Sequence, residues 1–103
     1  MADRLTQLLE LLYEMPGDAF LKYGVALEYM SRNDDDTALQ HFTELKISQP
    51  DYLPLYYQLG KVYERNNQIE NAIKTYNDGI IIARKHKDMH TLNELQSALD
   101  ELW

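Results

Sequence analysis

The stretch that decides the fold is residues 53–79, which read LPLYYQLGKVYERNNQIENAIKTYNDG. Apolar residues recur in it at spacings of three and four, as in the series Ile69, Ile73 and Tyr76. That spacing is typical of one face of a helix. The pair Asn66-Asn67 interrupts the pattern, and Asn tolerates the left-handed backbone that ends many helices. The stretch therefore predicts two helices joined by a tight turn.

The same pattern lies 34 residues earlier, in residues 19–45, which read AFLKYGVALEYMSRNDDDTALQHFTEL. Helical hairpins that repeat with this period stack on one another, because one hairpin alone cannot bury its apolar face. No stretch alternates with period two, so we expect no strands. The shift places similar residues on one another without a gap: Ala26 on Gly60, Tyr29 on Tyr63, Asn33 on Asn67, Ala38 on Ala72 and Phe42 on Tyr76.

On these residues the chain resembles the tetratricopeptide-repeat (TPR) family, as a small single-domain member of the bacterial type. Members carry a small residue where the two helices of a repeat cross, here Ala26 and Gly60, and an aromatic residue at repeat position 24, here Phe42 and Tyr76. The resemblance implies an all-α fold, a right-handed α-solenoid of helix-turn-helix hairpins with about six helices. It also implies a protein–protein interaction module or scaffold.

We expect one TPR-like domain over residues 1–103. The first helix aligns with the second helix of a hairpin. The last aligns with a first helix after a two-residue shift, which puts Gln96 at the small-residue position and suits a terminal cap. The expected parts are an N-terminal helix at 4–15, repeat 1 at 19–52, repeat 2 at 53–86 and a C-terminal capping helix at 88–102.

Polar residues mark the expected helix ends. Asp is a favoured N-cap and Asn a frequent residue just past a helix, while Pro is tolerated in a first turn. The predicted N-caps are Asp18, Asp34 and Asp88, the predicted C-terminal residues are Asn33 and Asn67, and Pro54 is expected in the first turn of its helix.

Two residues depart from the family pattern. Lys22 stands at repeat position 4, where a large apolar or aromatic residue is usual. We expect either that its stem lies along the surface or that Tyr23 packs in its place. Arg84 stands where the first repeat has Pro50, so that helix is expected to run on toward Lys87.

The formal net charge is −7, of which −6 falls in residues 1–52 and −1 in residues 53–103. An acidic surface repels phosphate backbones, so we expect no nucleic-acid partner. The basic run at residues 84–87 reads as a helix C-terminus that complements the dipole, with a docking patch as the alternative. Without a signal peptide or a stretch near the roughly 20 apolar residues of a membrane span, we expect no membrane association and a cytoplasmic location.

The sequence offers little for catalysis or metal binding. It has no Cys, no Gly-x-Ser-x-Gly and no Gly-rich phosphate loop, so we expect no enzyme, no catalytic residue and no cofactor. His86 and His90 are four apart, but no third ligand accompanies them, and we interpret them as solvated loop histidines. Residues 33–37 lack the ligand spacing of a calcium loop and read as a turn with a helix cap.

The resemblance also implies where a partner binds. Repeat positions 5 and 9 face the concave groove in this family, which implies Tyr23 and Tyr57 at position 5, Leu27 and Lys61 at position 9, and Asn93 from the shifted last helix. The expected partner is a protein or peptide of unknown identity. Alternatively, Leu27 only packs on the N-terminal helix. The carboxylate clamp that binds chaperone C-termini in some members has no match beyond Lys61, so that partner class is not carried over.

A second hypothesis is a structural homo-oligomer that assembles through the terminal helices. These helices carry more leucines than one packed face needs. The first has Leu5, Leu8, Leu9, Leu11 and Leu12, and the last has Leu92, Leu95, Leu99 and Leu102 with Trp103.

Overall fold

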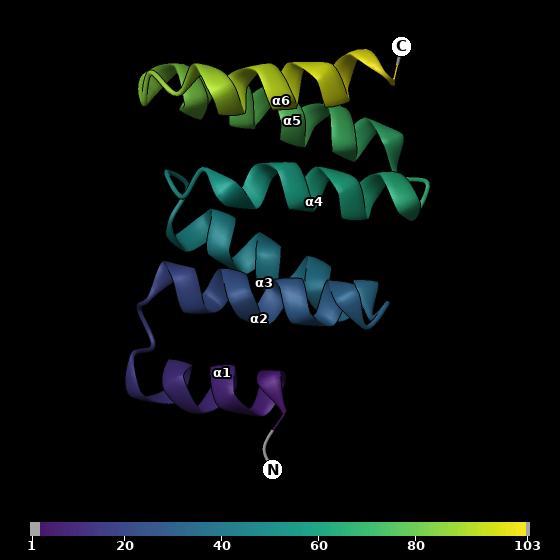
Figure 1. Ribbon diagram of the computed structural model, residues 1–103. Helices are drawn as coiled ribbons and strands as arrows, with labels where there is room; N and C mark the ends of the chain where they lie inside the picture. The colour runs from purple at the N-terminus through teal and green to yellow at the C-terminus, as the bar shows by residue number, and fades with distance from the viewer. Residues whose placement is uncertain (1–2, 103) are drawn as a thin grey trace. The chain divides into compact units, whose positions relative to one another are not determined.

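The computed structural model describes residues 3–102, and Trp103 therefore lies outside the described residues. Within that range the chain forms six helices and no strand (Figure 1), so the all-α prediction is confirmed. Along the same residues no helix combines the length and the apolar character that crossing a bilayer requires. The helices are α1 (Arg4–Glu14), α2 (Ala19–Ser31), α3 (Asp35–Ser48), α4 (Pro54–Arg65), α5 (Ile69–Lys85) and α6 (Met89–Asp100).

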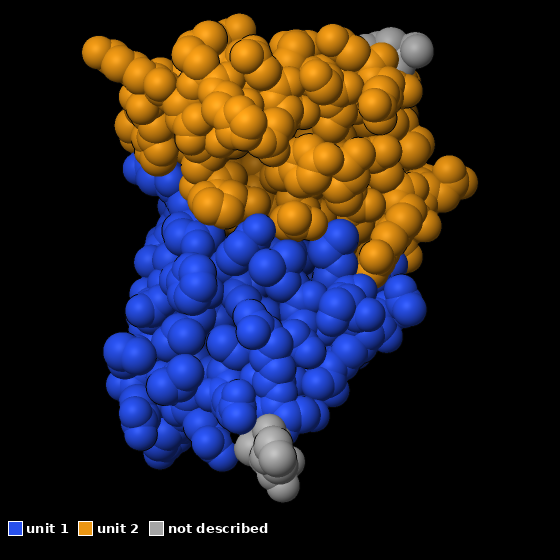
Figure 2. All heavy atoms as spheres, viewed as in Figure 1, with its two compact units in different colours: residues 1–52 blue, residues 53–103 orange. Residues whose placement is uncertain are grey.

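The chain divides into two compact units, residues 1–52 and residues 53–103 (Figure 2). Unit 1 contains α1, α2 and α3, and unit 2 contains α4, α5 and α6. The boundary falls between Tyr52 and Leu53, where the first repeat meets the second in the sequence. The single TPR-like domain over residues 1–103, with its inner boundaries, stays a prediction.

Aspartates begin most of the helices. Asp18, Asp34 and Asp88 each accept a hydrogen bond from the backbone N–H three residues ahead, at 2.9, 3.3 and 3.0 Å. Each carboxylate satisfies an N–H group that a helix start leaves without a helical partner. The three predicted N-caps are therefore confirmed, and so is the place of Pro54 in the first turn of α4, where it is the first residue. Asp3, a cap that we did not predict, serves α1 in the same way through Thr6 (2.8 Å).

Three helices are followed by a residue in the left-handed conformation: Asn33 and Asn67 with φ of 61° and Lys87 with φ of 57°. The next N–H in each case reaches a carbonyl five residues back, at 2.9–3.0 Å, which satisfies a helix-end acceptor. The two asparagines are confirmed in their predicted role, and Lys87 adds a third example. Because Arg84 replaces Pro, α5 continues to Lys85 and has 17 residues against 14 in α3.

In unit 2, two glycines let the buried tyrosines pack across the helices. A Cβ on Gly60 would overlap the ring of Tyr76, and a Cβ on Gly79 would lie 2.6 Å from Cβ of Tyr56. Tyr56 and Tyr76 are both buried, and the Tyr76 hydroxyl donates to the Glu64 carboxylate. Gly60 is thus small because an aromatic ring occupies the place of its side chain.

In unit 1 the equivalent positions hold Ala26 and Phe42, which are fully buried. The ring of Tyr23 packs against Phe42 (6.2 Å between centroids) and against Tyr52 (5.5 Å). Half-buried Lys22 donates to Oε1 of Gln49 (3.4 Å). Of the outcomes expected for this pair, Tyr23 therefore takes the packing role, while Lys22 ties α2 to the residue that follows α3.

The helix α1 contacts α2 through ion pairs at the surface and through half-buried leucines. Ion pairs join Arg4 to Glu28 (3.3 Å) and Asp3 to Arg32 (3.2 Å), and Leu8 packs over Gly24. No residue of α1 is fully buried, whereas α5 buries six. The first helix is consequently the least enclosed element of unit 1.

Candidate functional site

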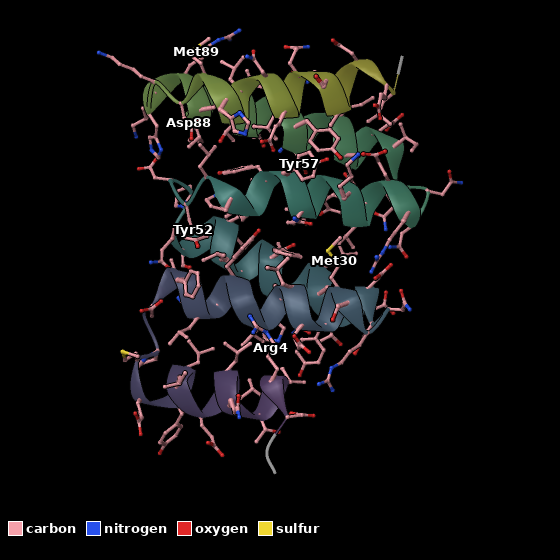
Figure 3. The ribbon with its side chains drawn as sticks, viewed as in Figure 1. Arg4, Met30, Tyr52, Tyr57, Asp88 and Met89 are labelled. Atoms are coloured by element: carbon pink, nitrogen blue, oxygen red, sulfur yellow. The ribbon has the colours of Figure 1, made fainter. Side chains whose placement is uncertain are left out.

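A cavity of about 330 Å³ opens in unit 2 between α4 and α6. Tyr57 and Lys61 line it from α4, and Tyr57 lies on the side of α4 that faces α6 (Figure 3). The rest of the wall is polar or small and comes from α6 and the residue after it: His90, Asn93, Glu94, Ser97, Ala98 and Glu101. Three of the five residues predicted to bind a partner, Tyr57, Lys61 and Asn93, thus meet around one cavity.

A chain of contacts orients the two α4 residues. Nζ of Lys61 lies 5.3 Å from the centroid of the Tyr57 ring and 3.5 Å from Oε2 of Glu64. Glu64 also accepts a hydrogen bond from the hydroxyl of Tyr76, whose ring lies 6.4 Å from that of Tyr57. Burial, together with the hydrogen bond to Glu64, raises the pKa of Tyr76 far above its usual range, so the hydroxyl remains a donor. Lys61 is therefore held against Tyr57 before any partner binds.

The α6 wall is positioned from its N-terminus. Asp88 caps the helix through Thr91, and the backbone hydrogen bond from Thr91 lowers the pKa of this carboxyl. Within the first two turns of α6, Nε2 of His90 lies 2.5 Å from Oε1 of Glu94. His90 is therefore part of a helix and not of a loop as we expected, because the cap at Asp88 starts α6 before it. His86 follows the end of α5.

Within residues 3–102 no group of three or more His, Cys, Asp or Glu side chains is arranged to hold a metal ion. The expectation that the chain binds no metal or cofactor stays a prediction.

The other two predicted partner-binding residues, Tyr23 and Leu27, lie on α2 in unit 1, and both are half-buried. Tyr23 contacts Phe42, and Tyr57 contacts Tyr76, so each position-5 tyrosine touches the position-24 aromatic residue of its own repeat. Repeat packing therefore accounts for part of both tyrosine rings. The remaining surface of each ring is what a partner could contact.

Sequence reasoning missed the charged part of the cavity wall. His90, Glu94 and Glu101 follow one another at steps of four and seven on the face that carries Asn93. These steps keep residues on one side of a helix, so the stripe was available from spacing alone. The ring contact between Tyr23 and Tyr52 had no such signal, because Tyr52 lies between helices.

Comparison with known proteins agrees with this architecture. The tetratricopeptide repeat family model matches residues 18–52 and 55–78. A tetratricopeptide repeat domain protein from Salinibacter ruber, solved in solution, is 40% identical with a TM-score of 0.81, over 84% of this chain and 88% of that one. A crystal structure of such a domain protein from the same organism is 40% identical with a TM-score of 0.79, over 82% and 94%.

A protein from Bordetella parapertussis, solved in solution, has a TM-score of 0.86 over 99% of this chain and 89% of that one. At 22% identity it supports the fold alone. A comparison with curated proteins gives no match.

The family model covers more than half of the sequence, and the Salinibacter ruber proteins share its repeat at substantial identity. The fold class is accordingly an all-α helical repeat of the solenoid type. Tetratricopeptide repeats are in general protein–protein interaction modules without catalytic activity, which bind proteins or peptides. The chain belongs to the tetratricopeptide repeat family.

Proposed function

We propose that the chain binds a peptide or an extended protein segment in unit 2, on the face formed by α4 and α6. The observation that carries this proposal is the cavity of about 330 Å³ around Tyr57, Lys61 and Asn93. A pocket of this size accepts one or two side chains of a partner. Tyr23 and Leu27 hold the same repeat positions on α2 as Tyr57 and Lys61 do on α4, and we propose that they contact a partner in unit 1.

The residue types suit peptide recognition. Tyr offers a rigid apolar ring at a small cost in conformational entropy, and such residues dominate binding energies at interfaces. The side-chain amide of Asn93 has both a donor and an acceptor, so it can pair with a peptide group of an extended partner. The proposal assigns no catalytic step to the chain, and a cytoplasmic location remains an expectation.

A double substitution tests the proposal. Tyr57→Ala with Lys61→Ala should weaken the binding of a partner captured with the wild-type chain by at least about tenfold, because it removes both α4 walls of the cavity. Isothermal titration calorimetry measures the affinity, and circular dichroism checks that the helical content is kept.

The matched control is Tyr13→Ala with Lys74→Ala, which removes the same residue types from strongly exposed places outside the cavity. Unchanged affinity in the Tyr57/Lys61 variant, or an equal loss in the control, would contradict binding at this face.

A second candidate function, a homo-oligomer assembled through α1, rests on a separate observation. A shallow cavity of about 380 Å³ follows the outer side of α1, lined by Gln7, Glu10, Leu11 and Glu14. The residues 34 positions later line a cavity in unit 1 whose other wall includes Lys22 of α2. They are His41, Glu44, Leu45 and Ser48. On α3 these positions face α2. The equivalent positions on α1 face no other helix of the chain's described part, and Leu11 among them is 43% exposed.

We assign this open face to α1 of a second copy. An end-to-end contact with α6 is disfavoured, because Gln96 fills the position where Gly60 admits the aromatic residue of a second helix. Sedimentation at high micromolar concentration should then give a dimer, and Leu11→Glu should return it to a monomer. Ile47→Glu, at another exposed apolar position, is the control. A single 12.1 kDa species for the wild type would remove this candidate.

A further inference from the structure

The cavity between α4 and α6 carries more negative than positive charge. Glu94 and Glu101 line it from the α6 side, and Lys61 is the one Lys or Arg among the lining residues. Glu94 has His90 as a neighbour, while Glu101 lies seven residues further along. At about 1.5 Å per residue, the backbone positions of Glu94 and Glu101 stand roughly 10 Å apart along the helix axis.

The charge of Lys61 is already compensated. Its ammonium lies 3.5 Å from the Glu64 carboxylate and over the face of Tyr57. A carboxylate from a partner would have to displace Glu64 from Lys61 and would face Glu94 and Glu101 on the opposite wall. A cationic side chain would take the place of His90 at Glu94, where Nε2 lies 2.5 Å from Oε1, but it would meet a second carboxylate, Glu101, on the same wall. The local charge therefore favours a basic partner over an acidic one.

The spacing of the carboxylates matches an extended ligand. In a polyproline II conformation, residues i and i+3 point the same way and lie about 9 Å apart, close to the separation of Glu94 and Glu101. Asn93 and Ser97 lie on the same wall and can pair with the peptide groups between. The net charge of −7 for the whole chain adds a long-range attraction for cationic segments.

We propose, building on the peptide-binding role above, that this cavity selects a basic extended segment with cationic side chains at positions i and i+3. One cation pairs with Glu94 and the other with Glu101. Asn93 holds the peptide backbone between them, and Tyr57 packs against the aliphatic stem of a cationic side chain.

Three fluorescein-labelled peptides that differ only at two positions test the proposal. Each contains a central X-Pro-Pro-X motif in a Gly/Ser context, with X as Arg, Leu or Glu. Fluorescence anisotropy should give the tightest binding for the Arg peptide, at least about tenfold tighter than for the Glu peptide. The affinity of the Arg peptide should fall as salt is raised from about 50 to about 300 mM, because charge pairing at a surface is screened.

Charge-neutral variants locate the effect. Glu94→Gln with Glu101→Gln should weaken the Arg peptide by about three- to tenfold, in line with two partly exposed ion pairs, and leave the Leu peptide unchanged. The control is Glu70→Gln with Asp36→Asn, which removes the same charge from exposed positions outside the cavity.

An equal loss in both double variants, or equal affinity of the Arg and Glu peptides, would overturn the charge selection. If the three peptides bound equally and Tyr57→Ala with Lys61→Ala abolished their binding, the groove would stand without its preference for basic segments. If none of the peptides bound, the inference would fail here, and the captured-partner experiment would decide the groove separately.

Discussion

At the scale of single residues, Gly60 and Gly24 look alike in the sequence but have different surroundings. Both lie inside the first helix of a hairpin, α2 or α4, and Gly inside a helix costs about 0.5 to 1 kcal/mol relative to Ala. A Cβ on Gly60 would overlap the buried ring of Tyr76. A Cβ on Gly24 would lie 3.4 Å from a flexible end of the Leu8 side chain. The two glycines therefore predict opposite responses to the same substitution.

Gly60→Ala should destabilise the chain by about 2 kcal/mol or more, because the buried tyrosine ring must move to admit the methyl group. Gly24→Ala should be neutral or raise stability by up to about 1 kcal/mol through helix propensity. Urea unfolding followed by circular dichroism measures both. A loss in Gly24→Ala as large as that in Gly60→Ala would contradict this account of packing.

The Tyr76 hydroxyl predicts how stability depends on alkaline pH. Burial, together with the bond to Glu64, raises the pKa of Tyr76, so the folded chain keeps this proton above pH 10, where an unfolded chain loses it. Proton release then favours unfolding, and stability falls as the pH rises above about 10. Tyr76→Phe should cost about 1 kcal/mol at neutral pH for the lost hydrogen bond.

Tyr76→Phe should also flatten the decline of stability between about pH 10 and 11 relative to the wild type. Tyr52 retains a pKa raised by burial in both proteins, so it contributes equally to the two profiles. Thermal unfolding midpoints over this pH range give the comparison. Parallel pH profiles for the two proteins would show that Tyr76 is not the group responsible.

At the scale of elements, Asp3 stabilises α1 in two ways. Its carboxylate caps the helix through Thr6 and pairs with Arg32 of α2. The backbone hydrogen bond from Thr6, with a further contribution from Arg32, lowers its pKa to about 2 from 3.8. The contribution of Asp3 to stability is therefore present above about pH 4 and is lost as the pH falls toward 2.

Two substitutions separate these roles. Asp3→Asn keeps a capping side chain but removes the charge that pairs with Arg32, and Asp3→Ala removes both. Amide hydrogen exchange in α1 should accelerate in the order wild type, Asn variant, Ala variant, while α5 is unaffected. Identical exchange in the Asn and Ala variants would mean that the cap contributes nothing beyond the ion pair.

At the scale of the whole molecule, the sequence predicted those features that short-range rules determine. The helices and their caps follow from local chemistry, since Asp and Asn act on backbone groups a few residues away. The repeat also predicted that Ala26 and Gly60 hold equivalent positions in the two hairpins, and that Phe42 and Tyr76 do so as well.

The cavity was only half predicted. Tyr57, Lys61 and Asn93 were placed by analogy with the repeat, whereas the charged neighbours Glu94 and Glu101 belong to the terminal helix, where the register is shifted. The bond from Tyr76 to Glu64 was missed, because it joins two helices across a turn and no spacing rule relates them. Long-range side-chain contacts of this kind need coordinates.

The distribution of burial along the chain predicts the order in which its helices open. In repeat proteins stability is roughly a sum over helix pairs and their neighbours, so a terminal element with little burial unfolds locally at low cost. α1 buries no residue completely, and its ion pairs to α2 lie at the surface, where such pairs contribute little. α5 buries Tyr76, Ile80 and four more residues.

Native-state hydrogen exchange should therefore show the slowest amides in α5 and the fastest helical amides in α1, with exchange rates that differ by about a hundredfold or more. The comparison is made with Leu11→Glu, which removes the dimer proposed through α1, and equal protection of α1 and α5 in that variant would contradict this order of opening.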